Sequence, residues 1–227
     1  MGFSTKTIAV LIPAYNADKS LAELIHRLRT SLGDVQIVVV DDGSSDRTRE
    51  IAASAGAAVL QHEKNRGKGA ALQTGFDYLN KQSGIEFILT MDADLQHQPE
   101  DVPKFFLAQK KSNADIVIGW RERIGTPMPV HRRLSNSITS ALVGMRTGVK
   151  IKDSQCGFRL MRRSVIEHIR LEAAGYEAET EFLIKAASRS FTMDFVPVQT
   201  IYGTEKSYMT HWATTVNFIR VIFRKYE

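Results

Sequence analysis

Residues 86–96 of this chain read Glu-Phe-Ile-Leu-Thr-Met-Asp-Ala-Asp-Leu-Gln, an apolar run that ends in two carboxylates two residues apart. The apolar part has the composition of a short buried strand. Because open α/β sheets bind ligands at the carboxyl ends of their strands, we expect Asp92 and Asp94 to project into that crevice. Carboxylate oxygens are hard ligands for Mg²⁺ or Mn²⁺, and such ions share one or two protein carboxylates with substrate phosphates. The stretch therefore predicts a metal site for a diphosphate.

Short runs rich in Val and Ile alternate with helical patterns on both sides of this stretch. The patterns predict strands at 7–12, 36–40, 57–61, 86–91, 115–119 and 191–196, and helices at about 21–28, 46–56, 69–80, 134–145 and 177–189, with a further helix that starts near Pro99. Ser20 is a candidate side-chain cap of the first helix. Strand, helix and strand repeated in this way predict an α/β fold with a single Rossmann-like, mostly parallel sheet flanked by helices.

Length and composition favour one domain without a membrane span. The chain has 227 residues, and none of its apolar stretches approaches the roughly 18 residues that a spanning helix needs. The first residues lack the apolar core of a secretory signal, and Cys156 is the only cysteine, expected as a small core residue. We therefore expect a cytoplasmic protein in a reducing compartment.

The positive charge of the chain lies in its second half. Residues 1–119 hold 13 Lys and Arg against 15 Asp and Glu, whereas residues 120–227 hold 17 against 10. A solvated face, a nucleic-acid surface and a site for phosphates or anionic membrane would all fit this excess. No nucleic-acid-binding motif accompanies it, so we expect no nucleic-acid partner. Residues 216–226 mix apolar and basic side chains at helical spacing, which predicts a helix on a membrane surface or one packed on the core.

Three further polar segments follow predicted strands or precede a helix. They are Ile-Pro-Ala-Tyr-Asn at 12–16, Val-Asp-Asp-Gly-Ser-Ser-Asp at 40–46 and Asn-Arg-Gly-Lys-Gly-Ala at 65–70. Each alone is typical of a turn or a helix cap. Because the carboxyl ends of parallel strands meet at one edge, we expect all three to converge with Asp92 and Asp94 on one crevice.

These segments, with Asp-Ser-Gln-Cys-Gly-Phe-Arg at 153–159 and Glu-Thr-Glu at 179–181, resemble family 2 glycosyltransferases, in the branch like dolichyl-phosphate mannosyltransferase. The resemblance covers nearly the whole chain in order. It implies a GT-A fold, a UDP- or GDP-linked sugar donor, a divalent metal and inversion at the anomeric carbon. It also implies a single domain with a nucleotide-sugar and metal half at about 1–119, an acceptor half at about 120–210 and an amphipathic helix at 211–227.

Carried over residue by residue, the resemblance implies these roles. The nucleotide sugar would contact Pro13, Tyr15, Asn16, Asp41, Asp42, Lys68, Asp92 and Lys206, the last in a loop that closes over the donor phosphates. The metal would be held by Asp92, Asp94 and Gln96, with Gln96 acting directly or through water. A bound cation would stabilise the charge that builds on the β-phosphate of the leaving group.

The acceptor decides whether a catalytic base is needed. A sugar hydroxyl must lose a proton during attack, whereas a lipid phosphate already carries a nucleophilic oxyanion. The resemblance assigns Arg132 and Ser135 to an acceptor phosphate, with His131 or Arg133 able to share the role and Arg159 close by. Glu179 falls where relatives that glycosylate hydroxyls carry an Asp base. Besides these residues, His97 is predicted as a surface turn residue and not a metal ligand.

The basic second half favours a phosphate acceptor. The sequence therefore predicts a metal-dependent enzyme that transfers a hexose to a polyprenyl phosphate, with Asp94, Arg132 and Glu179 as its catalytic residues and with peripheral contact at the cytoplasmic face of the membrane. Two alternatives stay open. One is transfer to a saccharide hydroxyl with Glu179 as the base, and the other is a non-catalytic nucleotide-sugar-binding subunit.

Overall fold

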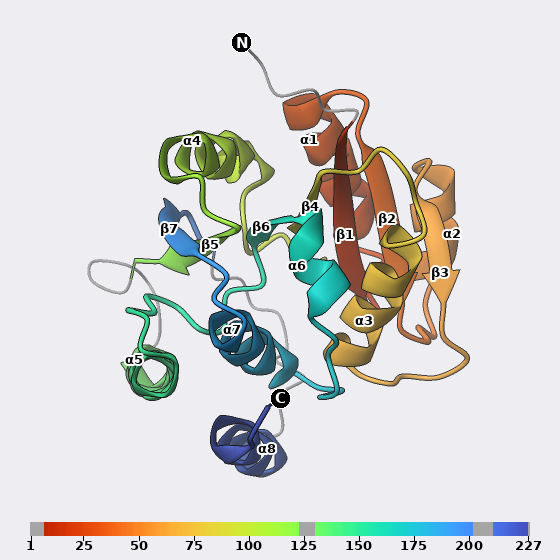
Figure 1. Cartoon of the computed structure of the whole chain (residues 1–227). Helices are drawn as coiled ribbons and strands as arrows, with labels where there is room; N and C mark the ends of the chain where they lie inside the picture. Colours follow the sequence, from red (N-terminus) through yellow and green to blue (C-terminus); the bar gives the residue numbers. More distant parts are fainter. Residues whose placement is uncertain (1–6, 123–129, 202–210, 227) are drawn as a thin grey trace.

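A seven-stranded sheet of order β3-β2-β1-β4-β6-β5-β7 forms the centre of the computed structural model, which describes residues 7–122, 130–201 and 211–226 (Figure 1). Its strands are β1 Ile8–Ala14, β2 Gln36–Asp41, β3 Ala58–Gln61, β4 Phe87–Thr90, β5 Ile116–Arg121, β6 Arg159–Arg162 and β7 Met193–Val198. The α-helices are α1 Leu21–Leu32, α2 Thr48–Ser54, α3 Lys68–Leu79, α4 Val102–Ser112, α5 Val130–Thr147, α6 Arg163–His168, α7 Ala178–Ser188 and α8 His211–Phe223, and a short 3₁₀ turn, η2 Pro99–Asp101, precedes α4. The predicted α/β fold is confirmed.

The half of the sheet formed by β3, β2, β1 and β4 is parallel. Strand β1 pairs in parallel with β2 and β4, and all seven of its residues are buried. Such a strand is covered on both faces and therefore reads as an uninterrupted apolar run, which is why its position was predicted correctly. Every residue of β4 is buried in the same way, and β4 delivers the Asp92 segment to the edge of the sheet.

The antiparallel strand β6 and the short helix α6 were not predicted. Strand β6 lies between β4 and β5 and runs against both. It has only four residues, Arg-Leu-Met-Arg, so it shows no apolar run, and its pairing depends on contacts far away in the sequence. Its insertion places the preceding loop, residues 153–158, beside the end of β4.

Two apolar layers cover the sheet. Leu24 of α1 and Phe105 of α4 belong to one core cluster, whereas Phe76 of α3, Phe182 of α7 and Phe218 of α8 belong to the other. Helices α5, α7 and α8 pack on one another on the second face (Figure 1). Of the two alternatives for the C-terminal helix, packing on the core is observed, and contact of its exposed side with a membrane stays a prediction. No helix in the described ranges is long and apolar enough to cross a membrane.

Ser20 does not cap α1 with its side chain, so that prediction is wrong. Ser20 stands at the N-cap position, but its hydroxyl donates to the carbonyl oxygen of Ala93 at 2.6 Å. That carbonyl lies between the two carboxylates of the Asp92–Asp94 segment. The hydroxyl therefore ties the start of α1 to this segment.

Candidate active site

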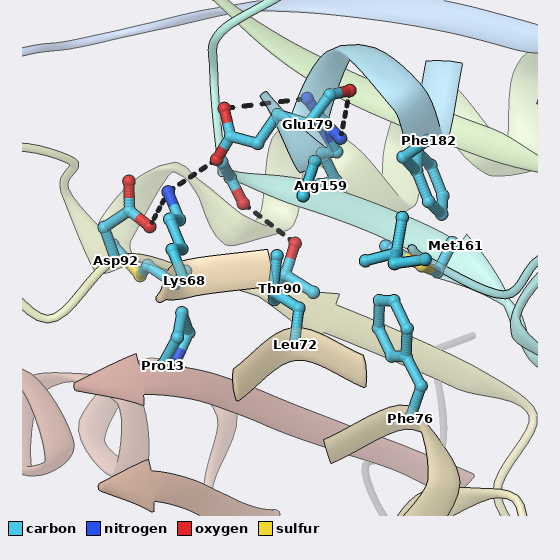
Figure 2. A pocket seen from close by; sticks show the side chains of 14 residues that line it. Pro13, Lys68, Leu72, Phe76, Thr90, Asp92, Arg159, Met161, Glu179 and Phe182 are labelled. Atoms are coloured by element: carbon cyan, nitrogen blue, oxygen red, sulfur yellow. Dashed lines mark hydrogen bonds and ion pairs between the residues drawn. The ribbon is translucent and has the colours of Figure 1, made fainter. Parts of the chain in front are cut away.

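The carboxyl ends of β1, β2 and β4 meet the loop before β6, and the predicted polar segments converge there. A pocket at this point has an apolar floor that includes Leu72, Phe76 and Phe182, and a charged rim (Figure 2). The rim is formed by Lys68, Asp92, Arg159 and Glu179, with Pro13 and Gly157 beside them.

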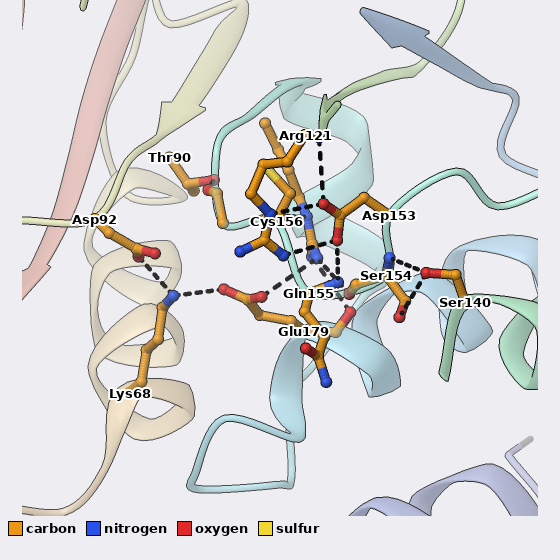
Figure 3. Close-up of polar contacts among 12 residues, drawn as sticks. Lys68, Thr90, Asp92, Arg121, Ser140, Asp153, Ser154, Gln155, Cys156 and Glu179 are labelled. Atoms are coloured by element: carbon orange, nitrogen blue, oxygen red, sulfur yellow. Dashed lines mark hydrogen bonds and ion pairs between the residues drawn. The ribbon is translucent and has the colours of Figure 1, made fainter. Parts of the chain in front are cut away.

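Lys68 lies at the middle of the rim. Its Nζ is 2.5 Å from Oδ1 of Asp92 and 2.5 Å from Oε1 of Glu179 (Figure 3). Burial alone would lower the pKa of Lys68, but the two carboxylates outweigh it and raise that pKa. Burial likewise favours the neutral form of Asp92, but the Lys68 ammonium outweighs it and lowers the pKa of Asp92. An ammonium therefore links two carboxylates that lie far apart in the sequence.

The start of α3 explains how Lys68 reaches both partners. The N–H groups of Gly69 and Ala70 donate to the carbonyl oxygen of Ala174 at 2.7 and 3.2 Å. A Cβ atom on Gly69 would come within 2.1 Å of the Ala173 carbonyl oxygen, so glycine is required for this close approach. The approach brings the start of α7, which carries Glu179, next to the start of α3.

Glu179 lies between two cations. Beyond Lys68, its Oε2 is 3.8 Å from an Nη atom of Arg159. Arg159, predicted to contact the acceptor, is buried, and it donates to the carbonyl oxygens of Cys156, Ser154 and Glu179 at 2.8 to 3.3 Å. In this arrangement its guanidinium fastens the loop before β6 to α7.

Gly157 separates the two carboxylates. A Cβ atom at this position would be 2.8 Å from Oδ1 of Asp92 and 2.8 Å from Oε1 of Glu179. Its carbonyl oxygen accepts a hydrogen bond from the Thr90 hydroxyl at 2.8 Å. The absence of a side chain at residue 157 is thus part of the geometry of the site.

A buried ion pair that the sequence did not reveal supports the same loop. The guanidinium of Arg121 contacts both carboxylate oxygens of Asp153, at 2.7 and 2.9 Å. Burial opposes the ionised form of Asp153, but Arg121 outweighs it and lowers the pKa of this carboxyl. The N–H of Ser154 donates to Ser140 of α5 at 3.1 Å, which joins α5 to the loop. No signal in the sequence pairs Arg121 with Asp153.

Hydrogen bonds within the protein hold the residues that were predicted to bind the nucleotide. Asp42 is buried, and its carboxylate contacts Nδ1 of His62 at 2.6 Å and the N–H groups of Arg66 and Gly67 at 2.9 and 2.7 Å. It therefore holds the loop that leads into Lys68. Its predicted contact with base or ribose stays a prediction.

The neighbouring residues form a second set of turns. The side-chain oxygen of Asn16, a residue with φ +49°, accepts the N–H of Ser45 at 2.9 Å. Asp41 is buried and accepts the N–H of Ser44 at 3.0 Å, while Tyr15 is exposed. Asn16, Asp41 and Tyr15 thus lie together at the ends of β1 and β2.

The predicted metal ligands Asp92, Asp94 and Gln96 lie on one turn. Asp94 accepts the N–H of Gln96 at 3.0 Å, and Leu95 between them has φ +57°, which bends the chain sharply. In the described part of the chain, no group of three or more His, Cys, Asp or Glu side chains is placed to hold a metal. Two carboxylates and an amide still fit Mg²⁺ or Mn²⁺, because such ions take further oxygen ligands from phosphates and water.

The predicted acceptor residues lie at the start of α5. Arg133 is half-buried and Ser135 is exposed in the first turns of that helix. His131 and Arg132 belong to α5, but their side chains lie outside the described part of the structure, and Lys206 lies outside it altogether.

His97 corrects one prediction. It is a buried residue and not a surface turn residue, since its ring packs on Phe158 at 5.6 Å between centroids and its Nε2 is 3.6 Å from Sγ of Cys156. Burial lowers the pKa of His97 to about 4 and raises that of Cys156 to about 12, so both are neutral at pH 7. Cys156 is a core residue, as predicted.

Tyr176 interacts electrostatically with the charged rim, and sequence reasoning missed it. Its side chain is partly exposed, in the turn before α7. Burial raises its pKa, and so do the carboxylates of Asp92, Glu179 and Asp94, whereas Lys68 opposes the rise. It therefore lies within the electric field of the charged rim.

Comparison with solved structures identifies the fold. Glucosyl-3-phosphoglycerate synthase from Mycobacterium tuberculosis, solved in complex with Mn²⁺, UDP and glucosyl-3-phosphoglycerate, superposes with a TM-score of 0.76 over 96% of this chain and 78% of its own, at 21% identity. This likeness shows the fold, and the sheet is that of the GT-A glycosyltransferases.

Sequence comparison gives the family. The model of glycosyl transferase family 2 matches residues 9–170, and the chain belongs to that family. An uncharacterised protein of Methanocaldococcus jannaschii is 35% identical over 96% of this chain and 90% of its own length. A UDP-N-acetylglucosamine–dolichyl-phosphate N-acetylglucosaminyltransferase of Methanococcus voltae is 30% identical over 87% of this chain and 86% of its own. The dolichol-phosphate mannosyltransferase of Pyrococcus furiosus is 34% identical over 78% of this chain, which spans about half (52%) of that enzyme.

Proposed function

We propose that the chain transfers a hexose, with inversion, from a UDP- or GDP-linked sugar to a polyprenyl phosphate. The single observation that carries the choice of acceptor is the position of Glu179 between Lys68 and Arg159. Both oxygens of this buried carboxylate already face cations, Lys68 at 2.5 Å and Arg159 at 3.8 Å, so neither is free to accept the proton of a sugar hydroxyl. A phosphate needs no base, and the named relatives of Methanococcus voltae and Pyrococcus furiosus act on dolichyl phosphate.

Asp92, Asp94 and Gln96 would hold Mg²⁺ or Mn²⁺ in this reaction. The cation would neutralise charge on the departing nucleoside diphosphate. Lys68 would contribute a second positive charge near the diphosphate. Arg132, Arg133 and Ser135 would orient the acceptor phosphate, since arginine binds phosphate oxygens through two parallel N–H donors.

The test is release of nucleoside diphosphate from a panel of UDP- and GDP-sugars with Mg²⁺ or Mn²⁺, with and without polyprenyl phosphate. We expect one donor to be used, faster with the lipid phosphate, and no turnover after chelation of the metal. Asp94→Ala should abolish transfer while the circular dichroism spectrum is unchanged. Full activity with the metal removed would refute the metal-dependent mechanism, and binding of every donor without release would favour the non-catalytic alternative.

The variant Glu179→Gln distinguishes a saccharide-hydroxyl acceptor from a phosphate acceptor. If Glu179 is a base, this variant should lose transfer to a saccharide by about 10²-fold or more, with loss of the acidic limb of the pH profile. If the acceptor is a phosphate, transfer should retain the same pH dependence.

Contact with a membrane surface fits a lipid acceptor. Helices α5 and α8 contact each other, and their outward-facing apolar residues are Leu134, Ile138, Met145, Val216, Ile219 and Phe223. Residues 130–152 and 206–226 contain no Asp or Glu, while Arg133, Arg146 and Arg220 are among the basic residues there. Apolar side chains within a basic surface favour an anionic bilayer. The cytoplasmic side stays a prediction.

Flotation with phosphatidylglycerol-containing and phosphatidylcholine vesicles tests this contact. We expect binding to the anionic vesicles that is lost in the double variant Met145→Glu and Phe223→Glu. Leu107→Glu is the matched control, because Leu107 is equally exposed but belongs to α4. Equal binding by all three proteins would rule out the α5–α8 surface.

A further inference from the structure

We propose that Lys68 competes with the divalent cation for Asp92, so that the cation binds tightly only when a nucleoside diphosphate binds with it. The inference rests on the proposed function and assigns Lys68 a positioning role, through Asp92, in the order of binding. Lys68 Nζ lies 2.5 Å from Oδ1 of Asp92, so the ammonium occupies the position beside this oxygen that a divalent cation would take. A cation that uses this oxygen must displace the ammonium, and one that uses the other oxygen must lie beside it.

The difference in burial between the two partners of Lys68 indicates which contact gives way. The side chain of Asp92 is 26% exposed, whereas that of Glu179 is 5% exposed. Loss of the ammonium from Glu179 would leave a buried carboxylate with only the more distant Arg159, whereas Asp92 can turn toward solvent or a cation. Lys68 therefore stays on Glu179 when Asp92 changes partner.

The charges then couple the two ligands. A divalent cation beside the Lys68 ammonium is repelled, because two positive charges then lie close together in a partly buried site. The negative charges of a nucleoside diphosphate offset this repulsion, because the diphosphate contacts both the cation and the ammonium. Binding of one ligand must then favour binding of the other by the same factor.

Lys68→Met separates this role from simple support of the site. Methionine retains the volume and length of the side chain but carries no charge. Removing the ammonium leaves the carboxylates of Asp92 and Glu179 beside Gly157 without the cation that links them, a position that a divalent cation can then occupy. We expect Mn²⁺ alone to bind this variant about 10-fold more tightly than wild type. A variant that only damaged the site would bind Mn²⁺ less tightly.

The measurement is titration of Mn²⁺ into the full chain, followed by the electron paramagnetic resonance signal of the free ion, with and without UDP or GDP. The expected result is tighter binding of Mn²⁺ alone to Lys68→Met and a smaller gain on adding nucleotide than in wild type. Lys185→Met is the matched control, since Lys185 is also a buried lysine between two carboxylates, and it should show no tighter binding. Lys68→Gln, which keeps a hydrogen-bond donor without the charge, serves if Lys68→Met does not fold.

The titration distinguishes failure of the Lys68 competition from failure of the metal-dependent function. If wild type binds Mn²⁺ with nucleotide but neither Lys68 variant binds Mn²⁺ alone more tightly than wild type, the competition is refuted and the proposed reaction stands. If wild type binds no Mn²⁺ even with UDP and GDP present, the metal-dependent function and this inference both fail.

Discussion

Two lysines of this protein each lie between two carboxylates, and one carboxylate of each set comes from α7. Lys68 contacts Asp92 and Glu179, whereas Lys185 contacts Glu172 at 2.8 Å and Glu181 at 2.9 Å. Glu179 and Glu181 are two residues apart on the helix, so they face different sides and serve different clusters.

The partners of the two clusters explain their different uses. Around Lys185, Glu181 also accepts the N–H groups of Glu172 and Ala173, Lys185 donates to the carbonyl oxygen of Arg170 at 2.6 Å, and Arg224 pairs with Glu172. The Lys68 cluster instead borders the pocket at the ends of β1 and β4, and its Asp92 side chain is a quarter exposed. Each cluster thus consists of one lysine and two carboxylates. The Lys185 cluster stabilises the fold, because other protein groups occupy its remaining hydrogen-bonding positions. The Lys68 cluster is available to a ligand, because it borders a pocket.

The largest expected effect is the loss of stability when the lysine of each cluster is replaced by methionine, and it should differ between the two clusters. Lys185→Met leaves the buried Glu181 charge without its cation, so we expect the free energy of unfolding to fall by about 3–5 kcal/mol. Lys68→Met should cost less stability, because Asp92 can turn to solvent and Arg159 remains beside Glu179, but it should reduce sugar transfer by about 10²-fold or more. Urea unfolding and a transfer assay on both variants test this. Equal loss of stability in both would break the distinction.

Gly157→Ala should damage the active-site cluster alone. Its methyl group would force apart the carboxylates of Asp92 and Glu179, each 2.8 Å from the new atom, and a misplacement of about 1 Å can reduce catalysis by about 10²-fold. Steady-state transfer rates measure the effect. Gly144→Ala in α5 is the control, since the nearest atom to its methyl group would be the Val149 carbonyl oxygen, at 3.2 Å. A fully active Gly157→Ala variant would show that the close contact of the two carboxylates is dispensable.

His97 differs from both lysines because it is buried without a paired charge. Its folded pKa of about 4 lies below the ordinary value of 6.5, so between these values the unfolded chain binds a proton that the native protein does not. Stability should therefore fall as the pH is lowered from 6.5, by about 2 kcal/mol at pH 5. Denaturant unfolding at several pH values measures this slope. His97→Gln should flatten it whatever its effect at pH 7, and an unchanged slope would contradict the assignment.

How far the sequence predicts this molecule depends on whether the relevant contacts are local. Strands such as β1 and β2 were predicted because burial on both faces leaves an apolar run in the sequence itself. Strand β6 has a charged residue at each end and acquires its place only by pairing with β4 and β5. Its position could not be predicted from local pattern.

The same limit applies to the site. The Asp92 and Asp94 segment was predicted from its position after a strand, and the structure brings it together with Lys68 and Glu179. The contact between Lys68 and Glu179, however, joins residues 111 positions apart and depends on the packing of α7 against α3. His97 was wrongly placed at the surface because a polar residue in a turn-like segment does not reveal that Phe158 will cover it.

The smallest effect lies at the far end of α7, beyond the Lys185 cluster. Ser190 has φ +60°, in the left-handed region where the Cβ of an L-residue costs about 1–2 kcal/mol. Glycine avoids that strain but loses more entropy on folding, so Ser190→Gly should stabilise the protein by roughly 0.5–1 kcal/mol. Thermal unfolding measures the gain, and Ser190→Ala, which retains the Cβ, should show none. Sugar transfer should not change in either variant, because Ser190 lies outside the charged rim; a shift in transfer would show that this end of α7 is coupled to the Lys68 cluster after all.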